Sequence, residues 1–407
     1  MIEYFDIAYI AITLSSICLL TSIYKEKRIL GARWNSVFFA IFFFIIAPIN
    51  ENINNIVYYN GKGNTDLSFA YSCLIILLFS ILLLLSIFTV NSNINARSNR
   101  YIDISKFKMN LTVLQLAPWI FGIIYLYLMG WEYGYLTLRE PVTEIEYFQI
   151  NYLIADRFIR PGISIFNFIL LNSSLKKLNK FIALCSLLIF SFPTSTPRFI
   201  TVFIYLPFIL LLFDSIVINK LNRILITTFI LFALPMGFII SNYFRSLDYL
   251  KNIFDDNLLE VIMNTGHLDS FQSLQNTIDY VNITSGKQLI GSILFFIPRY
   301  IWPTKPVGSS SVMADSSGLS WNNIGMSLFS EGYINFGIFG VIIFSFIFVY
   351  FATKNDTMKH LNYKNIIFRY YFPGSIFIIL RGDLTSAFTL IFPMIFFNLF
   401  FNLIIKK

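Results

Sequence analysis

Residues 68–90 read "SFAYSCLIILLFSILLLLSIFTV", a run of 23 residues that contains no charged side chain. An apolar run of about 20 residues is long enough to cross the hydrocarbon core of a bilayer as a helix. The whole chain shares this character, because 56% of its 407 residues are hydrophobic and only 13% are charged. Soluble domains contain about 25% charged residues. The composition therefore excludes a soluble protein.

Similar apolar runs recur along the chain and predict eleven membrane spans. They cover residues 4–24, 35–57, 68–90, 111–131, 158–175, 181–195, 198–218, 224–244, 327–352, 366–382 and 385–405. Because a backbone in lipid must satisfy its own hydrogen bonds, each span is expected to be a helix. We therefore predict an all-α polytopic membrane protein in which residues 1–407 form one integral membrane domain.

Lysine and arginine collect in alternate loops, such as "KEKRILGAR" at 25–33 and "NKLNR" at 219–223. Short loops of this kind stay on the cytoplasmic side, which places the N-terminus outside and the C-terminus inside. These loops also account for the formal net charge of +8, so no nucleic-acid partner is expected. The acidic start "MIEYFD" does not resemble a cleaved signal peptide.

Two segments, 132–157 and 245–326, are then predicted to be external loops. The larger one contains "FFIPRYIWPTKPVG" at 295–308. Its apolar part, residues 288–302, is too short and too rich in proline to cross the membrane and return. We expect this part to be re-entrant or to lie in the interface. Its prolines would then hold Arg299 and Lys305 at the outer leaflet.

Three more arginines, Arg160, Arg198 and Arg381, are predicted at the outer ends of spans. Ionisable groups at this depth are costly and commonly functional, and a guanidinium binds phosphate through two parallel hydrogen bonds. Together with Arg299 and Lys305, they predict a site for an anionic lipid headgroup, and a pyrophosphate fits best. The alternative is structural, with each arginine snorkelling or paired to an acid, as Arg381 with Asp383.

Three outer groups could accept a proton from an incoming hydroxyl: Glu331 in "SLFSEGYINF", His267 in "NTGHLDSF" and Asp383 in "RGD". Each also has a structural interpretation as an ion-pair partner, a helix cap or a surface group. Trp302 and Tyr333 are expected to stack on sugars or to belong to an interfacial aromatic belt. The first external loop lacks an Asp-x-Asp pair, which favours a site without metal or cofactor, where arginines neutralise phosphate.

The run "FFIPRYIWPTKP", the Gly/Ser loop after it and "SLFSEGYINFGIFG" together resemble the Wzy-type O-antigen polymerases, as do "PTSTPRF" and the late "RGD". The resemblance implies a GT-C-like glycosyltransferase of the bacterial inner membrane with its active site facing the periplasm. It also implies undecaprenyl-pyrophosphate-linked glycans as donor and acceptor, with Arg198, Arg299 and Arg381 holding them. A chain-length regulator is a possible further partner.

Three other functions stay open. An O-antigen ligase would share an arginine-lined external site but transfer the polymer to lipid A-core. A flippase or transporter of lipid-linked oligosaccharides would need charges along a path that faces both sides, whereas the ionisable groups predicted at membrane depth crowd the outer side. A scaffold of an export machine would need no arginines at membrane depth.

Overall fold

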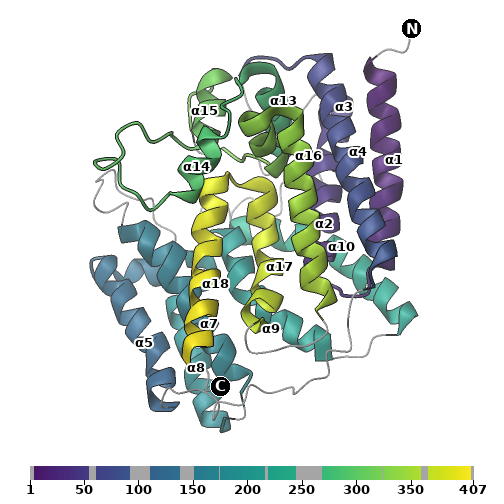
Figure 1. The fold of residues 1–407 in the computed structure, drawn as a ribbon. Coiled ribbons are helices and arrows are strands. Elements are labelled where there is room, and N and C mark those ends of the chain that lie inside the picture. Colours follow the sequence, from purple (N-terminus) through teal and green to yellow (C-terminus); the bar gives the residue numbers. More distant parts are fainter. Residues whose placement is uncertain are drawn as a thin grey trace.

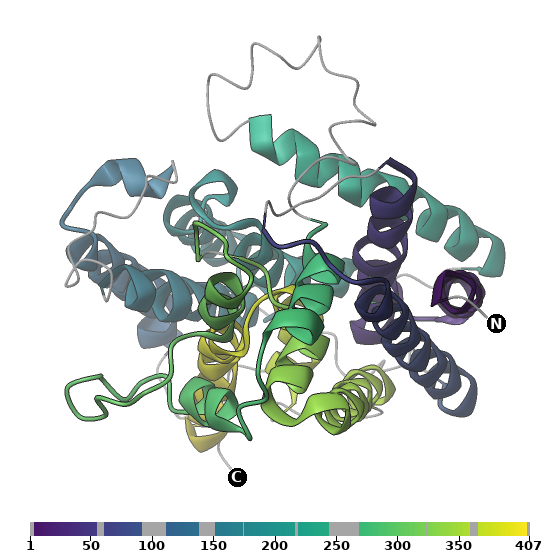
Figure 2. The ribbon, with the colours of Figure 1, turned by 90° about the horizontal axis from the view of Figure 1, so that it is seen from above.

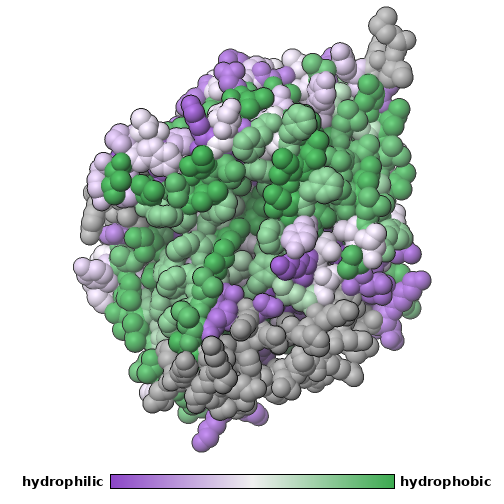
Figure 3. Space-filling view, viewed as in Figure 1, coloured by the Kyte–Doolittle hydropathy of each residue, from purple (hydrophilic) through white to green (hydrophobic). Residues whose placement is uncertain are grey.

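The computed structural model describes residues 4–54, 61–91, 111–137, 151–173, 175–215, 219–243, 268–322, 324–358 and 365–404. This part of the chain is all-helical, and eight of its helices are long and apolar enough to cross a membrane. The prediction of an α-helical polytopic membrane protein is thereby confirmed. Figure 3 shows the apolar band that this class requires, with polar residues above it.

The described part of residues 4–243 forms thirteen helical elements (Figure 1). They are α1 (Tyr4–Lys25), α2 (Ala32–Ala40), η1 (Ile41–Ile46), α3 (Ala47–Asn54), α4 (Asp66–Thr89), α5 (Leu111–Leu128), η3 (Tyr133–Leu136), η4 (Ala155–Ile159), α7 (Arg160–Leu171), α8 (Lys177–Phe190) and η5 (Pro193–Ser195), followed by α9 (Arg198–Ser215) and α10 (Lys220–Tyr243). Helices α2, η1 and α3 together make the second candidate span.

The second half supplies α13 (Ser270–Tyr280), α14 (Lys287–Ile293), α15 (Ser309–Ser316), α16 (Leu328–Thr357), α17 (Ile366–Arg381) and α18 (Leu384–Ile404). Helices α13, α14 and α15 lie together over one end of the bundle, which Figure 2 views from above. We call residues 268–326 the cap and this end the cap end. The opposite end, where α16 finishes and α17 begins, is the far end.

Three of the eleven expected spans, 158–175, 198–218 and 366–382, are not among the eight candidates. Their helices are α7, α9 and α17, of which α7 and α17 have only 12 and 16 residues. Nearly every residue of α7 and α17 is buried by neighbouring helices, so both lie inside the bundle. The eleven-span count and the orientation remain predictions.

The expected external loop 245–326 contains helices where the structure describes it. In α13, all eight residues from Ser270 to Thr277 are buried, although most are polar. The carboxylate of Asp279 holds this helix to the start of α4, since it accepts hydrogen bonds from Thr65 N and Oγ1 at 2.9 and 2.7 Å and from Ser68 Oγ at 2.7 Å. The cap is thus fixed to the bundle through polar contacts.

A break in α16 positions the next part of the cap. Gly337 has a φ of 61°, a conformation that a residue with a side chain rarely adopts. The break leaves the carbonyl of Ile334 to accept from Thr284 N at 2.7 Å, and the carbonyl of Asn335 to accept from Gly286 N at 3.0 Å. These bonds satisfy carbonyls that an intact helix would have used. They also fix the start of α14, which packs on α16 and α18.

Candidate functional site

Glu331 lies in the first turn of α16 and is fully buried under the cap. Its Oε1 accepts a hydrogen bond from the backbone N–H of Leu384, at the start of α18, at 2.8 Å. Its Oε2 accepts one from the hydroxyl of Ser309, at the start of α15, at 2.9 Å. Among the described residues, no arginine or lysine forms an ion pair with this carboxylate. It is therefore held by neutral donors.

Asp383 immediately precedes α18, next to Leu384, whose backbone N–H donates to Glu331. Its Oδ1 accepts from Ser386 N at 2.8 Å, which makes it a side-chain cap of α18. Its Oδ2 accepts from Ser310 Oγ at 3.4 Å. We call Ser309, Ser310, Glu331 and Asp383 the carboxylate site. The positive end of the α18 dipole stabilises negative charge here.

Arg381, the last residue of α17, ties this helix to the cap. Its guanidinium forms a bidentate ion pair with Asp269, in which Nε–Oδ1 and Nη2–Oδ2 are both 2.9 Å. Asp269 is 3% exposed and Arg381 is 18% exposed. The guanidinium also lies over the ring of Phe199, 5.3 Å from its centroid. Arg198 precedes Phe199 and is half-buried at the start of α9, so the chain brings both predicted arginines to the cap end.

Arg299 and Lys305 lie in the segment between α14 and α15. The side chain of each donates hydrogen bonds to backbone carbonyls of this same segment. Arg299 is exposed and donates to the carbonyls of Lys305 and Pro306, at 2.8 and 3.3 Å. Lys305 Nζ donates to the carbonyls of Phe295 and Ile297, at 2.7 and 3.0 Å. Burial, with the nearby Arg299, lowers the pKa of Lys305. We call residues 295–305 the cation loop.

The two aromatic candidates, Trp302 and Tyr333, differ in their surroundings. Trp302, in the cation loop, is half-buried and donates from its ring to Thr304 Oγ1 at 3.1 Å. Tyr333 is half-buried and packs against the main hydrophobic core. It follows Glu331 by two residues, which is about 200° around a helix, so it faces away from the carboxylate site. His267 lies outside the described residues.

Arg160 lies apart from these groups and is 1% exposed. It donates to Asp156 Oδ1 at 2.8 Å, to the carbonyls of Tyr135, Phe190 and Ser195, and to Ser195 Oγ at 2.9 Å. Its plane also lies over Tyr125, 4.5 Å from the ring centroid. These bonds use every donor of the guanidinium. Arg160 therefore ties η3 and η5 to α7.

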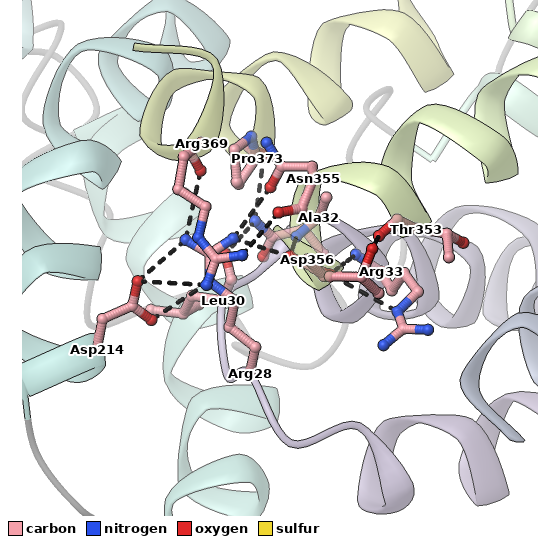
Figure 4. A network of polar contacts seen from close by, with 12 residues as sticks. Arg28, Leu30, Ala32, Arg33, Asp214, Thr353, Asn355, Asp356, Arg369 and Pro373 are labelled. Carbon is pink, nitrogen blue, oxygen red and sulfur yellow. Dashed lines mark hydrogen bonds and ion pairs between the residues drawn. The ribbon is translucent and has the colours of Figure 1, made fainter. Parts of the chain in front are cut away.

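A cluster of six charged residues at the far end has no counterpart among the predicted site residues. All of them except Glu26 are labelled in Figure 4. The far-end cluster consists of Glu26, Arg28, Arg33, Asp214, Asp356 and Arg369, and five of these are at most 1% exposed. It balances three cations against three anions. The sequence offers one indication of this cluster, because Glu26 and Asp356 are acidic residues within loops that are otherwise basic.

Arg28 is the centre of the far-end cluster. It contacts Asp214 Oδ2 at 3.1 Å and Asp356 Oδ1 at 2.9 Å, and its Nη2 donates to the carbonyl of Arg369 at 3.3 Å. These partners come from the ends of α9 and α16 and from the start of α17. The turn after α1 is thereby bound to three other helices, and Figure 4 shows the residues converging on it.

The structure therefore revises one expectation. The described residues place buried charge at both ends of the bundle, and not at one end alone. The two ends differ in how that charge is arranged. The far-end cluster pairs each carboxylate with arginine, whereas the carboxylates of Glu331 and Asp383 are held by serine hydroxyls and backbone amides.

Comparison with protein-family models, with curated proteins and with solved structures finds no match to this chain. The resemblance to the O-antigen polymerases therefore remains a prediction from sequence motifs. The functional conclusion has to come from the geometry of the carboxylate site and of the cations around it.

Proposed function

We propose that this chain is a membrane glycosyltransferase of GT-C-like architecture that polymerises undecaprenyl-pyrophosphate-linked oligosaccharide repeat units into a surface polysaccharide. One observation carries the proposal. Residues far apart in the sequence bring a buried carboxylate, Glu331, to the same end of the bundle as Arg381 and the cation loop. A base beside groups that bind an anion is what glycosyl transfer from a lipid pyrophosphate requires.

In the proposed reaction, the acceptor hydroxyl oxygen attacks the anomeric carbon of the donor sugar. The bond from that carbon to the pyrophosphate oxygen breaks, and the electron pair leaves with the pyrophosphate. The hydroxyl proton passes to a carboxylate, for which Glu331 is our candidate. Arg299, Lys305 and Arg381 are the candidates that hold the pyrophosphate, after exchanging their present protein partners for its oxygens.

The roles of the remaining predicted residues follow from their surroundings. Arg160 has no donor left for a ligand, so we assign it a structural role. Arg198 stays a candidate for the pyrophosphate through its position beside Phe199, and Trp302 a candidate for sugar stacking. Asp383 completes the carboxylate pair and orients the start of α18. His267 stays an alternative base.

The far-end cluster favours an enzyme over a flippase. Transport by alternating access needs one part of the bundle to rock against the other around the binding site. At the far end such motion would separate Arg28 from carboxylates on two other helices, and leaving a buried charge without its partner costs about 3–5 kcal/mol. An enzyme that works at the cap end needs no such opening.

The direct test replaces Arg299 with alanine and with lysine in cells and resolves the surface polysaccharide on a gel. Arg299→Ala is expected to leave single repeat units on the core, and Arg299→Lys to keep shortened chains, because an ammonium binds phosphate without bidentate geometry. Lys287→Ala, an exposed cation of the same cap, is the control and should keep the full ladder.

Other outcomes distinguish the rival functions. A full ladder in Arg299→Ala would remove the cation loop from the site. Loss of every attached unit would point to an O-antigen ligase or a flippase. Reporter fusions at residues 300 and 355 test the orientation, which is expected to be outside for the first and inside for the second. The reverse result would put the cap on the wrong side for periplasmic polymerisation.

A further inference from the structure

If Glu331 is the base, the hydroxyl of Ser309 lies where the hydroxyl of an acceptor sugar would have to bind. It donates to Glu331 Oε2 at 2.9 Å, while the other oxygen is fixed by Leu384 N at 2.8 Å. A hydroxyl that donates to a buried carboxylate is the arrangement that an acceptor alcohol must form before it loses its proton. Ser309 itself is 1% exposed, so no other hydroxyl can reach Oε2 while it is there.

We propose that Glu331 Oε2 is the subsite for the acceptor sugar hydroxyl and that Ser309 fills this subsite in the resting protein. This inference rests on the proposed function, and it names the ligand of the site as an alcohol that exchanges with a serine hydroxyl. Residues 306–310, which carry Ser309, form a plug that must move before the acceptor binds.

The two sides of the Ser309–Glu331 contact are anchored very differently. Glu331 belongs to α16, a helix of 30 residues, and Leu384 begins α18, which has 21. The plug follows the cation loop and ends with the first two residues of α15, a helix of only eight residues. Within α15, Met313 and Ala314 pack into the small hydrophobic cluster of the cap, but Ser309 and Ser310 precede them. The plug is therefore the side that can move.

The plug fits closely enough to exclude other molecules from both carboxylates. A Cβ on Gly308 would lie 2.9 Å from Asp383 Oδ2, so only glycine permits this approach without a shift. Ser310 covers the same oxygen through its hydroxyl at 3.4 Å. When the plug moves away, Glu331 and Asp383 become accessible together, which places the acceptor between them.

The cation loop also restrains the plug. The hydrogen bonds from Arg299 end on the carbonyls of Lys305 and Pro306, the last residue of the loop and the first of the plug. A pyrophosphate that binds Arg299 competes for the same N–H donors. Donor binding therefore loosens the plug, and the acceptor subsite opens after the donor has bound.

A disulfide can lock the plug. An added Cβ on Gly291 in α14 would lie 3.6 Å from Cβ of Pro306, and disulfides join Cβ atoms about 3.5–4.5 Å apart. The test uses the double variant Gly291→Cys/Pro306→Cys with Cys18, Cys73 and Cys185 replaced by serine. Pro306→Cys alone is the control, because it carries the same loop change without a partner.

Two readouts are measured in the oxidised and the reduced protein. Labelling of Glu331 by N,N′-dicyclohexylcarbodiimide, quantified by peptide mass spectrometry, reports plug opening without any turnover. We expect labelling to fall at least tenfold on oxidation and to return with dithiothreitol. Polymerisation of lipid-linked repeat units should fall and recover in parallel, while Pro306→Cys should respond to neither treatment.

The two readouts separate the failure of this inference from failure of the proposed function. Equal Glu331 labelling in the oxidised and reduced double variant, with the disulfide formed, overturns the plug. Full polymerisation by the oxidised protein overturns the acceptor subsite. Absence of polymerisation by the wild-type protein overturns the proposed function and with it the acceptor subsite, and the labelling then still decides whether the plug opens.

Discussion

Asp356 offers the sharpest test of how the far end is held together. Its carboxylate is fully buried and accepts from the backbone N–H groups of Ala32 and Arg33, at 3.0 and 2.7 Å, and from Arg28 Nη1 at 2.9 Å. Those two amides belong to the first turn of α2, whose N-cap residue, Gly31, has no side chain to cap them. Asp356 therefore caps one helix from the end of another.

Replacing Asp356 with alanine removes all of these acceptors at once. Two backbone N–H groups lose their partner, and the far-end cluster keeps three arginines against two carboxylates. Removing one partner of a buried ion pair costs about 3–5 kcal/mol, which includes the unpaired charge that remains. Because about 1.4 kcal/mol is a tenfold change in an equilibrium constant, opening of the bundle should become about 10² to nearly 10⁴ times more frequent.

Cys73 can report this opening, because its side chain is 0% exposed within α4. In a variant with Cys18 and Cys185 replaced by serine, the rate at which a maleimide labels Cys73 in detergent measures how often the bundle opens. Lys354→Gln is the matched control, since Lys354 is exposed two residues earlier on the same helix. A labelling rate in Asp356→Ala less than tenfold above that of Lys354→Gln would refute our account of the far end.

Three further predictions concern Lys305, Arg160 and Arg381. Because burial and Arg299 lower the pKa of Lys305, its amine should react with acetic anhydride at a lower pH than lysine in an unstructured peptide, and Arg299→Gln should shift this reaction back toward higher pH. Arg160→Lys keeps the charge but offers three donors to acceptors on several loops, so we expect faster proteolysis of detergent-solubilised protein; unchanged digestion would contradict the structural role. A double-mutant cycle on Arg381→Ala and Asp269→Ala, measured by thermal unfolding, should give a coupling of about 0.5–3 kcal/mol, and strict additivity would show that this ion pair does not hold the cap.

The cation loop shows how much residue patterns could indicate. Its prolines, Arg299 and Lys305 predicted a break in the apolar pattern, and α14 ends at Ile293, before these residues. The pattern could not show that both cations donate to carbonyls of their own loop. Hydrogen bonds between residues six to ten positions apart depend on the path of the backbone, which residue types alone do not specify.

The pairing of Arg381 shows a different limit. Its neighbour in sequence, Asp383, was the expected partner, yet Arg381 forms its bidentate ion pair with Asp269, 112 residues earlier. Asp383 instead caps α18. A capping carboxylate is oriented toward its own helix, so the guanidinium of Arg381 pairs with the cap instead.

The amino-acid sequence by itself determined the class of this protein. Apolar runs of membrane-spanning length admit one solution in lipid, the helix, because every backbone group must be satisfied within the segment. Only the tertiary structure decided which ionisable groups meet. Burial makes an unpaired charge costly, so the packing of distant helices selected Ser309 for Glu331, Asp269 for Arg381 and Asp356 for Arg28, and none of these pairs is close in sequence.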